Sequence, residues 1–472
     1  MLHHLNRRAI LAATSVLSAA ALLPGKVSAQ TRQSSATSLP ARKEFVVRGA
    51  HVLTMDDALG DFTRGDVHVR DGAIVAVGPN VSEPGAEIVD GKGMICMPGF
   101  VDTHWHHWTT LLRSVMRADD PAKTYFPVTF ALGVHYTPED SYRAVRLGLA
   151  EAVSAGVTTT HNWAHNVRGP AHADAEVQAM RDSGLRGRFA YGPALGMPND
   201  QPMDLADIAR MKRDIGTDPM ISLGICSRNV DGNTGGTRGA IDAAMAKKEW
   251  SAARELGLPI TLHTSGTGAI KILDEAGLLG PDLQLVHPLN TSPEDWAALA
   301  KQGVRYSVSP IGEAGRGGEM QFPEMLQAGV KLSISIDNVT AERCDCFACM
   351  HVMQTINRHR TGGKVKITTK QLVRMATLGG AEDLGLAKAA GSLTPGKRAD
   401  LILVRTTGAN MRGMGDPYDA LVQLATASDV DTTVVDGRIL YRGGQYTVLD
   451  TEKLEADGAQ SIAALKAKAK WA

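Results

Sequence analysis

The stretch PGFVDTHWHHWTT, residues 98–110, places an apolar run directly before three closely spaced histidines. In an extended strand, side chains two positions apart face the same side, so His104 and His106 would point together while Trp105 points away. A single histidine in such a place is more often a satisfied core residue than a ligand. Whether this pair belongs to a metal site depends on what the rest of the chain brings to it.

Seven further strand-like runs follow this one, and helical patterns separate them. They are GVTTTHNW from 156, RGRFAYG from 186, MISLGICS from 220, PITLHT from 259, LQLVHP from 283, VRYSVSP from 304 and KLSISIDN from 331. Eight strands that alternate with helices over roughly 250 residues are typical of a (β/α)8 TIM-type barrel. We therefore predict an α/β fold with such a barrel over residues 98–388.

Short β-like runs also lie near both ends of the chain. EFVVRGAHVLTM from 44, GDVHVRDGAIVAVG from 65 and AEIVDGKGMICMPG from 86 precede the barrel, and GSLTPGKRADLILV from 391 and DTTVVDGRILYRGG from 431 follow it. Neither set is large enough to form a domain alone. We predict that residues 43–97 and 389–450 pair into one small β-sandwich, and that residues 451–472 form a C-terminal helix.

The charge composition of the chain indicates which kind of binding partner to expect. The 472 residues include 50 Lys+Arg and 50 Asp+Glu, and the positive charges form no basic stripe. Such a balance offers no electrostatic footprint for nucleic acid or an anionic membrane. We expect a small-molecule substrate and no nucleic-acid partner. The oligomeric state stays open, a homo-oligomer included.

The first 29 residues have the layout of a signal peptide. Arg7 and Arg8 precede a short apolar stretch, and VSA stands directly before Gln30. The apolar stretch is too short to span a membrane. The twin arginine resembles a Tat signal, with an ordinary Sec signal as the alternative. We expect cleavage that leaves no membrane anchor, a flexible mature N-terminus over residues 30–42, and a periplasmic or secreted protein.

Polar residues close several of the predicted barrel strands. His104 and His106 end the first strand, His263 the fifth, His287 the sixth and Asp337 the eighth. Barrel enzymes build their sites at these C-terminal strand ends, where side chains from separate strands converge. Four imidazoles and a carboxylate at matching ends predict a metal site rather than a set of core residues.

In these motifs the chain resembles the amidohydrolase superfamily, in particular its cytosine deaminase and triazine chlorohydrolase branch. The resemblance is carried by PGFVDTHWH, GVTTTHNWAH, LH at 262, LVHP at 285, SISIDN at 333 and GSLTPGKRADLILV at 391. It implies a metal-dependent hydrolase barrel with a small β-sandwich, in which His104, His106, His263 and Asp337 are metal ligands. It also implies that His287 contacts the attacking water or the substrate, and that Asp337 accepts the water proton.

The number and kind of metal ions follow from the same resemblance. Binuclear relatives use a lysine at the end of the fourth strand, where this chain reads ISLGICSRN and has none. We therefore expect one divalent ion. Imidazole and carboxylate ligands favour zinc, with iron, manganese or cobalt as alternatives.

One departure from the branch bears on the substrate. Its ring deaminases carry H-x-x-E after the fifth strand, and Gly266 stands here in the place of that glutamate. Hydrolysis of an acyclic amide, urea or carbamate needs no such acid, as in the thiocarbamate and phenylurea hydrolases that the chain also resembles. We therefore expect a metal-activated water to cleave a C–N bond of such a small molecule. The alternatives are deamination of an aminopyrimidine or aminopurine, with His165 or Glu313 as the acid, and a non-catalytic small-molecule binding protein.

The remaining candidates are weaker. His165, Trp108 and Glu313 are candidate substrate-binding residues, although packing is the favoured role of Trp108 and a solvated loop position that of Glu313. His161 follows the second strand as His165 does. Cys96 and Cys226 fit a strand core, and we expect Cys344, Cys346 and Cys349 to be structural thiols or to form one local disulfide rather than a zinc site.

Overall fold

The computed structural model describes residues 39–471 except residues 114, 118, 231–239, 265–267, 288, 317 and 341. The predicted signal peptide and most of the segment 30–42 lie outside the described residues, and so does Gly266. Within that segment, the Arg42 guanidinium donates to Asp436 at 2.8 Å and the Pro40 carbonyl accepts from Arg438 at 3.0 Å. Residues 40 and 42 of this segment are therefore hydrogen-bonded to the terminal sheet.

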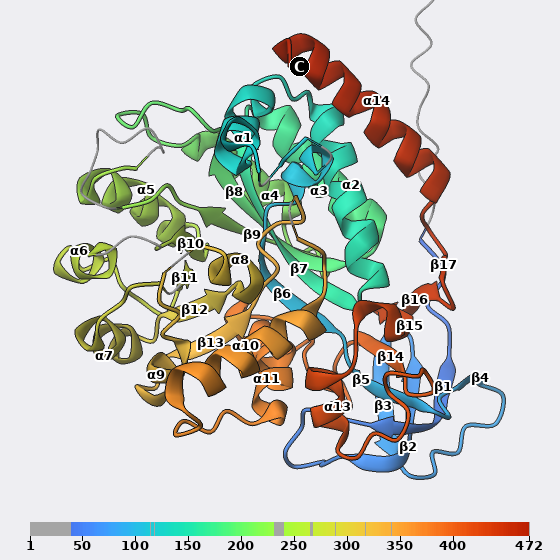
Figure 1. The fold of residues 1–472 in the computed structure, drawn as a ribbon. Coiled ribbons are helices and arrows are strands. Elements are labelled where there is room, and N and C mark those ends of the chain that lie inside the picture. The colour runs from blue at the N-terminus through green and yellow to red at the C-terminus, as the bar shows by residue number, and fades with distance from the viewer. Residues whose placement is uncertain are drawn as a thin grey trace, which may run out of the picture. The chain divides into compact units, whose positions relative to one another are not determined.

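Eight parallel strands form the centre of the fold (Figure 1). They are β6 (Phe100–Trp105), β7 (Val157–Val167), β8 (Arg186–Pro193), β9 (Ile221–Cys226), β10 (Ile260–His263), β11 (Leu283–Val286), β12 (Arg305–Val308) and β13 (Lys331–Ile334). They pair in chain order, and each falls on one of the runs predicted above. Contacts between the ends of β6 and β13 bring the first and last strands together, so the predicted (β/α)8 barrel is confirmed.

Helices connect these strands and cover the outside of the barrel. They are η1 (His107–Leu112), η2 (Pro121–Lys123), α1 (Tyr125–Gly133), α2 (Pro138–Ser154), α3 (Pro170–Ser183), α4 (Leu205–Ile215), α5 (Ala243–Glu255), α6 (Ala269–Glu275), α7 (Pro293–Gln302), α8 (Pro310–Ala314), α9 (Phe322–Gln327), α10 (Cys346–Thr361), α11 (Thr369–Met375) and α12 (Leu378–Asp383). Local sequence sets their starts. At α2, for example, the Thr137 hydroxyl and the Asp140 carboxylate form a reciprocal capping box, and Pro138 occupies the first turn.

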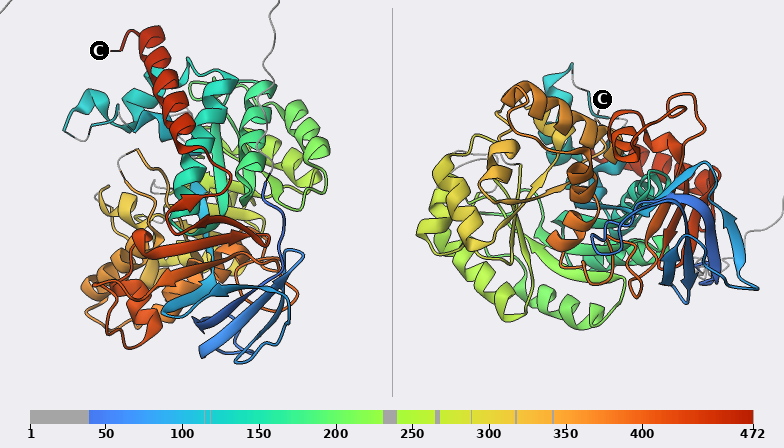
Figure 2. Two further views of the ribbon diagram at one scale, coloured as in Figure 1. Left: turned by 90° about the vertical axis from the view of Figure 1, so that its right-hand side faces the viewer. Right: turned by 90° about the horizontal axis from the view of Figure 1, so that it is seen from below.

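A second sheet is built from both ends of the described chain. It contains β1 (Phe45–Val52), β2 (Phe62–Arg70), β3 (Ala73–Gly78), β4 (Glu87–Asp90), β5 (Met94–Pro98), β14 (Leu401–Arg405), β15 (Val430–Val435), β16 (Arg438–Arg442) and β17 (Gln445–Tyr446). Antiparallel pairing of β5 with β14 joins the two halves, and Figure 2 shows the blue and red strands side by side. Helices α13 (Pro417–Gln423), η3 (Ala427–Asp429) and α14 (Thr451–Ala469) complete the chain.

Alternation along the joining strands explains why this sheet and the barrel pack together. On β5, Cys96 belongs to the small core inside the terminal sheet, whereas Ile95 and Met97 belong to the large barrel core. On β14, Leu401 faces the small core and Ile402 the barrel core. Because successive side chains of a strand point to opposite faces, one face of β5 and β14 is buried in the small core and the other in the barrel core.

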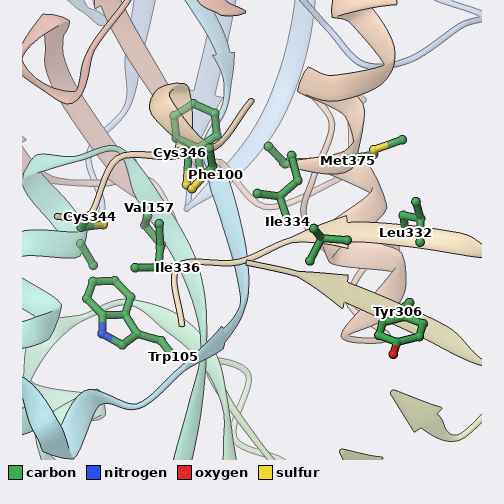
Figure 3. Close-up of a cluster of buried hydrophobic side chains, with 14 of the residues drawn as sticks. Phe100, Trp105, Val157, Tyr306, Leu332, Ile334, Ile336, Cys344, Cys346 and Met375 are labelled. Atoms are coloured by element: carbon green, nitrogen blue, oxygen red, sulfur yellow. The ribbon is translucent and has the colours of Figure 1, made fainter. Parts of the chain in front are cut away.

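The predicted structural thiols lie in an apolar environment. Cys344 and Cys346 lie near Phe100 and Ile336 in the barrel core (Figure 3). All five cysteines are buried and free, and burial raises the pKa of the Cys344, Cys346 and Cys349 thiols. Thiols that stay protonated are poor metal ligands, which supports the structural interpretation over a zinc site. In the described part of the chain, no helix is long and apolar enough to cross a bilayer.

A buried ion pair joins the barrel to the terminal sheet. The guanidinium of Arg186, at the start of β8, donates to Asp400 at 2.6 and 3.3 Å and to the Pro219 carbonyl at 2.7 Å. The two paired side chains are 3% and 1% exposed. Because the pair is dry, removal of one partner leaves the other charge buried without compensation.

We expect Arg186→Met to lower the free energy of unfolding by about 3–5 kcal/mol. The matched control is Arg181→Met, because Arg181 is 38% exposed in its ion pair with Asp218. That change should cost about 0–1 kcal/mol. Urea unfolding of the two variants measures the difference, and equal losses would contradict the structural role given to Arg186.

Candidate metal centre

The five strand-end residues meet at one point at the C-terminal end of the barrel. Nε2 of His104 and Nε2 of His106 each lie 3.3 Å from Oδ1 of Asp337. Nε2 of His263 lies 3.3 Å from Nε2 of His104, and Nε2 of His287 lies 3.9 Å from Oδ2 of Asp337. The structure thus brings together the five residues that the sequence singled out, and Trp105 belongs to the barrel core.

The backbone between β6 and β13 sets this convergence. The His106 amide donates to the Asp337 carbonyl at 2.7 Å, and the Asp337 amide donates to the His104 carbonyl at 2.8 Å. The Asp102 carboxylate accepts from the Ile336 amide at 2.9 Å and so ties the same two segments together one residue earlier. These bonds hold the carboxylate of Asp337 opposite the two imidazoles.

Two residues of the cluster adopt a backbone conformation that is unusual for a side chain. The φ angles are 67° at His287 and 72° at Asp337. Residues other than glycine are strained in this region and tend to persist there at functional sites, where the surrounding fold holds them. The strain turns both side chains toward the centre of the barrel mouth.

Burial and charge set the protonation of the cluster. Burial lowers the pKa of His104 to about 4, with the neighbouring His106 adding to the effect, and burial also lowers the pKa of His263 and His287 well below the usual range. Burial would raise the pKa of Asp337, but the Arg316 guanidinium, at 2.5 Å, holds that pKa well below its usual value. Near neutrality, the imidazoles of His104, His263 and His287 are thus uncharged beside an ionised carboxylate.

This donor set fits a divalent metal ion. Neutral imidazole nitrogens and a carboxylate are the ligands that zinc prefers, and four donors at about 2.0–2.1 Å from one tetrahedral ion lie roughly 3.3 Å from each other. Three separations match that spacing at 3.3 Å: those of His104 and His106 from Asp337, and that of His263 from His104. Two triads of the cluster, one with Asp337 and one with His287, bring donor atoms within 4.8 Å of each other.

The prediction that Glu313 is a solvated loop carboxylate is wrong. Glu313 lies on α8 with no exposed surface, where Oε1 lies 3.1 Å from Nδ1 of His287 and accepts from the Ser309 amide at 2.8 Å. Because Nδ1 of His287 has this partner, its Nε2 is left to face Asp337. The short connection after β12 turns the Glu313 carboxylate toward the barrel mouth. Its Gly-rich sequence gives no sign of this inward orientation. Glu313 thus supports His287 from behind.

A cavity of about 910 Å³ opens above the cluster. Its lining includes Trp163, whose ring stacks on His263 with centroids 4.2 Å apart, together with Tyr125, Phe130 and His165. This volume and these aromatic walls suit a drug-sized organic ligand that carries flat rings. The cavity places His165 where the sequence predicted a substrate contact.

Trp108 and His161 do not line this cavity. Trp108 is fully buried on η1, and its indole N–H donates to Nδ1 of His165 at 3.1 Å. Trp108 therefore packs behind His165, which agrees with the packing role that we favoured from the sequence. It is not placed to touch a substrate. His161 is also buried, with Nδ1 2.9 Å from the Thr103 carbonyl of β6.

Sequence reasoning missed several charged residues of the site. Arg316 pairs with Asp337, Glu342 lines the cavity, and Arg228 forms a buried ion pair with Glu249 at 2.5 Å. Arg228 also donates to two carbonyls of the loop after β8 and so shapes the cavity wall. Arg316 and Glu342 lie in loops after β12 and β13, where no strand period marks the inward residues.

The fold and this site together define a metal-dependent barrel hydrolase. Residues 95–440 match the Amidohydrolase family, and the chain belongs to that family. It is a hydrolase that acts on carbon–nitrogen bonds. The resemblance found in the sequence motifs is thereby confirmed.

Curated relatives match nearly the whole chain. A 5'-deoxyadenosine deaminase of Methanosarcina mazei is 28% identical over 444 residues, which cover 90% of this chain and 99% of that protein. A 5-methylthioadenosine/S-adenosylhomocysteine deaminase of Pelotomaculum thermopropionicum is 28% identical, with 88% of this chain and 96% of that protein covered. Both names describe hydrolytic removal of an amino group from a purine ring.

Solved structures agree on the fold. An adenosine deaminase of Xanthomonas campestris with bound zinc has a TM-score of 0.79 at 21% identity and covers 91% of this chain and 100% of its own. A variant of the atrazine chlorohydrolase of Arthrobacter aurescens, with zinc and atraton, has a TM-score of 0.76 at 19% identity, with 89% and 100% covered. At these identities the likeness concerns the fold alone.

We expect the purified mature protein to hold about one tightly bound divalent ion per chain. Joint replacement of His104 and His106 by alanine should abolish this content, because it removes two donors. The matched control is His359→Ala, at an exposed position on α10, which should keep the ion. Elemental analysis after metal supplementation gives the answer. Unchanged stoichiometry in the double variant would rule out the cluster as the site.

A substitution of His287 tests whether this residue acts on the water or the substrate rather than as a metal ligand. We expect His287→Asn to keep the metal and to lower kcat by about 10²–10⁴-fold, the range for a positioned acid–base group. Metal content and kcat are measured on the same preparation. Loss of the ion together with activity would instead make His287 a ligand and contradict the separate role.

Proposed function

We propose that the protein is a zinc-dependent aminohydrolase that removes an amino group from an aromatic heterocycle. The observation that carries the proposal is the placement of a complete donor cluster at the floor of a cavity with aromatic walls, large enough for a nucleoside. The names of the full-length relatives favour deamination among the reactions that break carbon–nitrogen bonds. The adenine ring of a nucleoside is the first substrate to test.

Each residue of the cluster takes a distinct role in this proposal. His104, His106, His263 and Asp337 hold the zinc ion. When bound, zinc lowers the pKa of a water molecule to about 7 and so supplies a nucleophile near neutrality. Zinc is preferred to iron, manganese or cobalt because solved structures of the same fold hold it.

The chain's own groups move the protons. The ionised Asp337 accepts a proton from the attacking water as the new C–O bond forms at the ring carbon that bears the amino group. It then returns this proton to the amino group, which leaves as ammonia when the C–N bond breaks. Nε2 of His287, oriented through Nδ1 by Glu313, contacts the developing hydroxyl.

Hydrolysis of an acyclic amide, urea or carbamate is the second candidate. One observation favours it: Gly266 occupies the place of the acid that the ring deaminases of this branch carry. An acyclic substrate would release an amine with a carboxylate or carbamate, whereas a ring substrate would release ammonia and keep its skeleton. The two reactions are thus separable by their products.

We also infer that the protein acts outside the cytoplasm. Arg7 and Arg8, the apolar stretch and the VSA sequence before Gln30 support export by the Tat pathway and cleavage near Gln30. The Tat pathway exports folded proteins, which suits a chain whose metal cluster is assembled from strands far apart in sequence.

The direct test is a substrate screen on the zinc-loaded mature protein. Adenosine, 5'-deoxyadenosine and an aminopyrimidine are compared with a phenylurea, a carbamate and an anilide, and ammonia and amine release are measured for each. We expect ammonia from at least one heterocycle and much slower turnover of the acyclic compounds. Amine release from an acyclic compound without ammonia from any ring would overturn deamination in favour of the second candidate.

A further inference from the structure

Glu342 is a carboxyl group in the cavity that the mechanism above does not use. It lies in the connection between β13 and α10, five residues after Asp337, and its side chain lines the cavity. Within the described residues it has no hydrogen bond or ion pair, unlike Asp337 or Glu313. A largely buried carboxyl that faces a ligand cavity without a protein partner is available to a substrate.

Gly312 brings this carboxyl close to the metal cluster. A Cβ atom at Gly312 would lie 2.8 Å from Oε1 of Glu342 and 3.3 Å from Oδ2 of Asp337. The two carboxylates therefore border the same small space, which exists because position 312 has no side chain. A ring carbon attacked beside Asp337 would have its neighbouring ring nitrogen within reach of Glu342.

The electrostatic setting suits a proton donor. Burial raises the pKa of Glu342 to about 8, with the charge of Asp337 adding to the effect and that of Arg316 opposing it. A carboxyl group with this pKa carries a proton near neutrality. Glutamates with raised pKa values serve as general acids in other enzymes.

The acids considered from the sequence are less well placed. Oε1 of Glu313 is engaged with His287 and the Ser309 amide, and its Oε2 is buried away from the cavity. His165 lines the cavity, but burial lowers its pKa well below the usual range, so its imidazole is neutral near pH 7 and a poor acid. Its Nδ1 already accepts from the Trp108 indole.

We propose that Glu342 is the catalytic acid that protonates the substrate's ring nitrogen and so replaces the glutamate absent at position 266. The proposal rests on the proposed deamination. As the water oxygen bonds to the ring carbon, the C=N electron pair moves to nitrogen, which takes the proton of Glu342, while Asp337 takes the proton of the water. Asp337 then protonates the amino group, ammonia leaves, and the remaining hydroxyl proton returns to Glu342 as the C=O bond forms.

The experiment compares three variants on the substrate that wild-type protein deaminates fastest. Glu342→Gln keeps the size of the side chain and removes the acid, so kcat should fall by about 10²–10⁴-fold with metal content unchanged. Glu342→Ala should lose as much, and added acetate should restore part of it because a free carboxylic acid fits the vacated space. Acetate should not restore Glu342→Gln, where the amide fills that space. Glu294→Gln, exposed on α7, is the matched control.

The outcomes separate this proposal from the one it rests on. A loss of kcat below about tenfold in Glu342→Gln, with deamination intact in the wild type, would overturn the role of Glu342 alone. Equal losses in both Glu342 variants without acetate rescue, together with a lowered melting temperature or weaker binding of the product, would assign Glu342 a structural role and also overturn the proposal. Absence of ammonia from every heterocycle with wild-type protein would overturn the proposed function itself.

Discussion

The contact between the ends of β6 and β13 is the interaction on which the site depends. Two backbone hydrogen bonds, from the His106 amide to the Asp337 carbonyl and from the Asp337 amide to the His104 carbonyl, bring the first and last strands together at the barrel mouth. The same hydrogen bonds hold Nε2 of His104 and Nε2 of His106 at 3.3 Å from the Asp337 carboxylate. The junction that closes the barrel therefore also holds three of the five residues of the cluster in place.

That closure would be costly without electrostatic compensation. A carboxylate buried among imidazoles would take up a proton, because desolvation disfavours its charge. The Arg316 guanidinium prevents this by its pairing with Asp337 at 2.5 Å, and burial keeps His104 and His263 neutral. The outcome is a set of donors prepared for a cation before it binds. Glu313 also prepares the site, because its hydrogen bond to Nδ1 of His287 leaves Nε2 to face the cavity.

The barrel strands, and the convergence of these five residues at the barrel mouth, could be predicted from the sequence because both follow a local rule. Apolar runs at regular intervals predict strands, and a polar residue at a strand's end, such as His263 on β10, lies at the mouth by topology. Loops follow no such period. Glu313 was therefore misjudged, and Arg316 and Glu342 were missed, because their inward positions come from tertiary packing, such as that of Glu342 beside Gly312, rather than from spacing. Trp108 shows the converse, a motif residue that packs behind the cavity wall.

Anomalous scattering at the zinc absorption edge, from crystals of the zinc-loaded protein, tests the central claim most directly. The account predicts a single strong peak per chain within about 2.0–2.2 Å of the Nε2 atoms of His104, His106 and His263 and of a carboxylate oxygen of Asp337. A peak elsewhere, or no peak although the three separations of 3.3 Å among these side chains are kept, would contradict it.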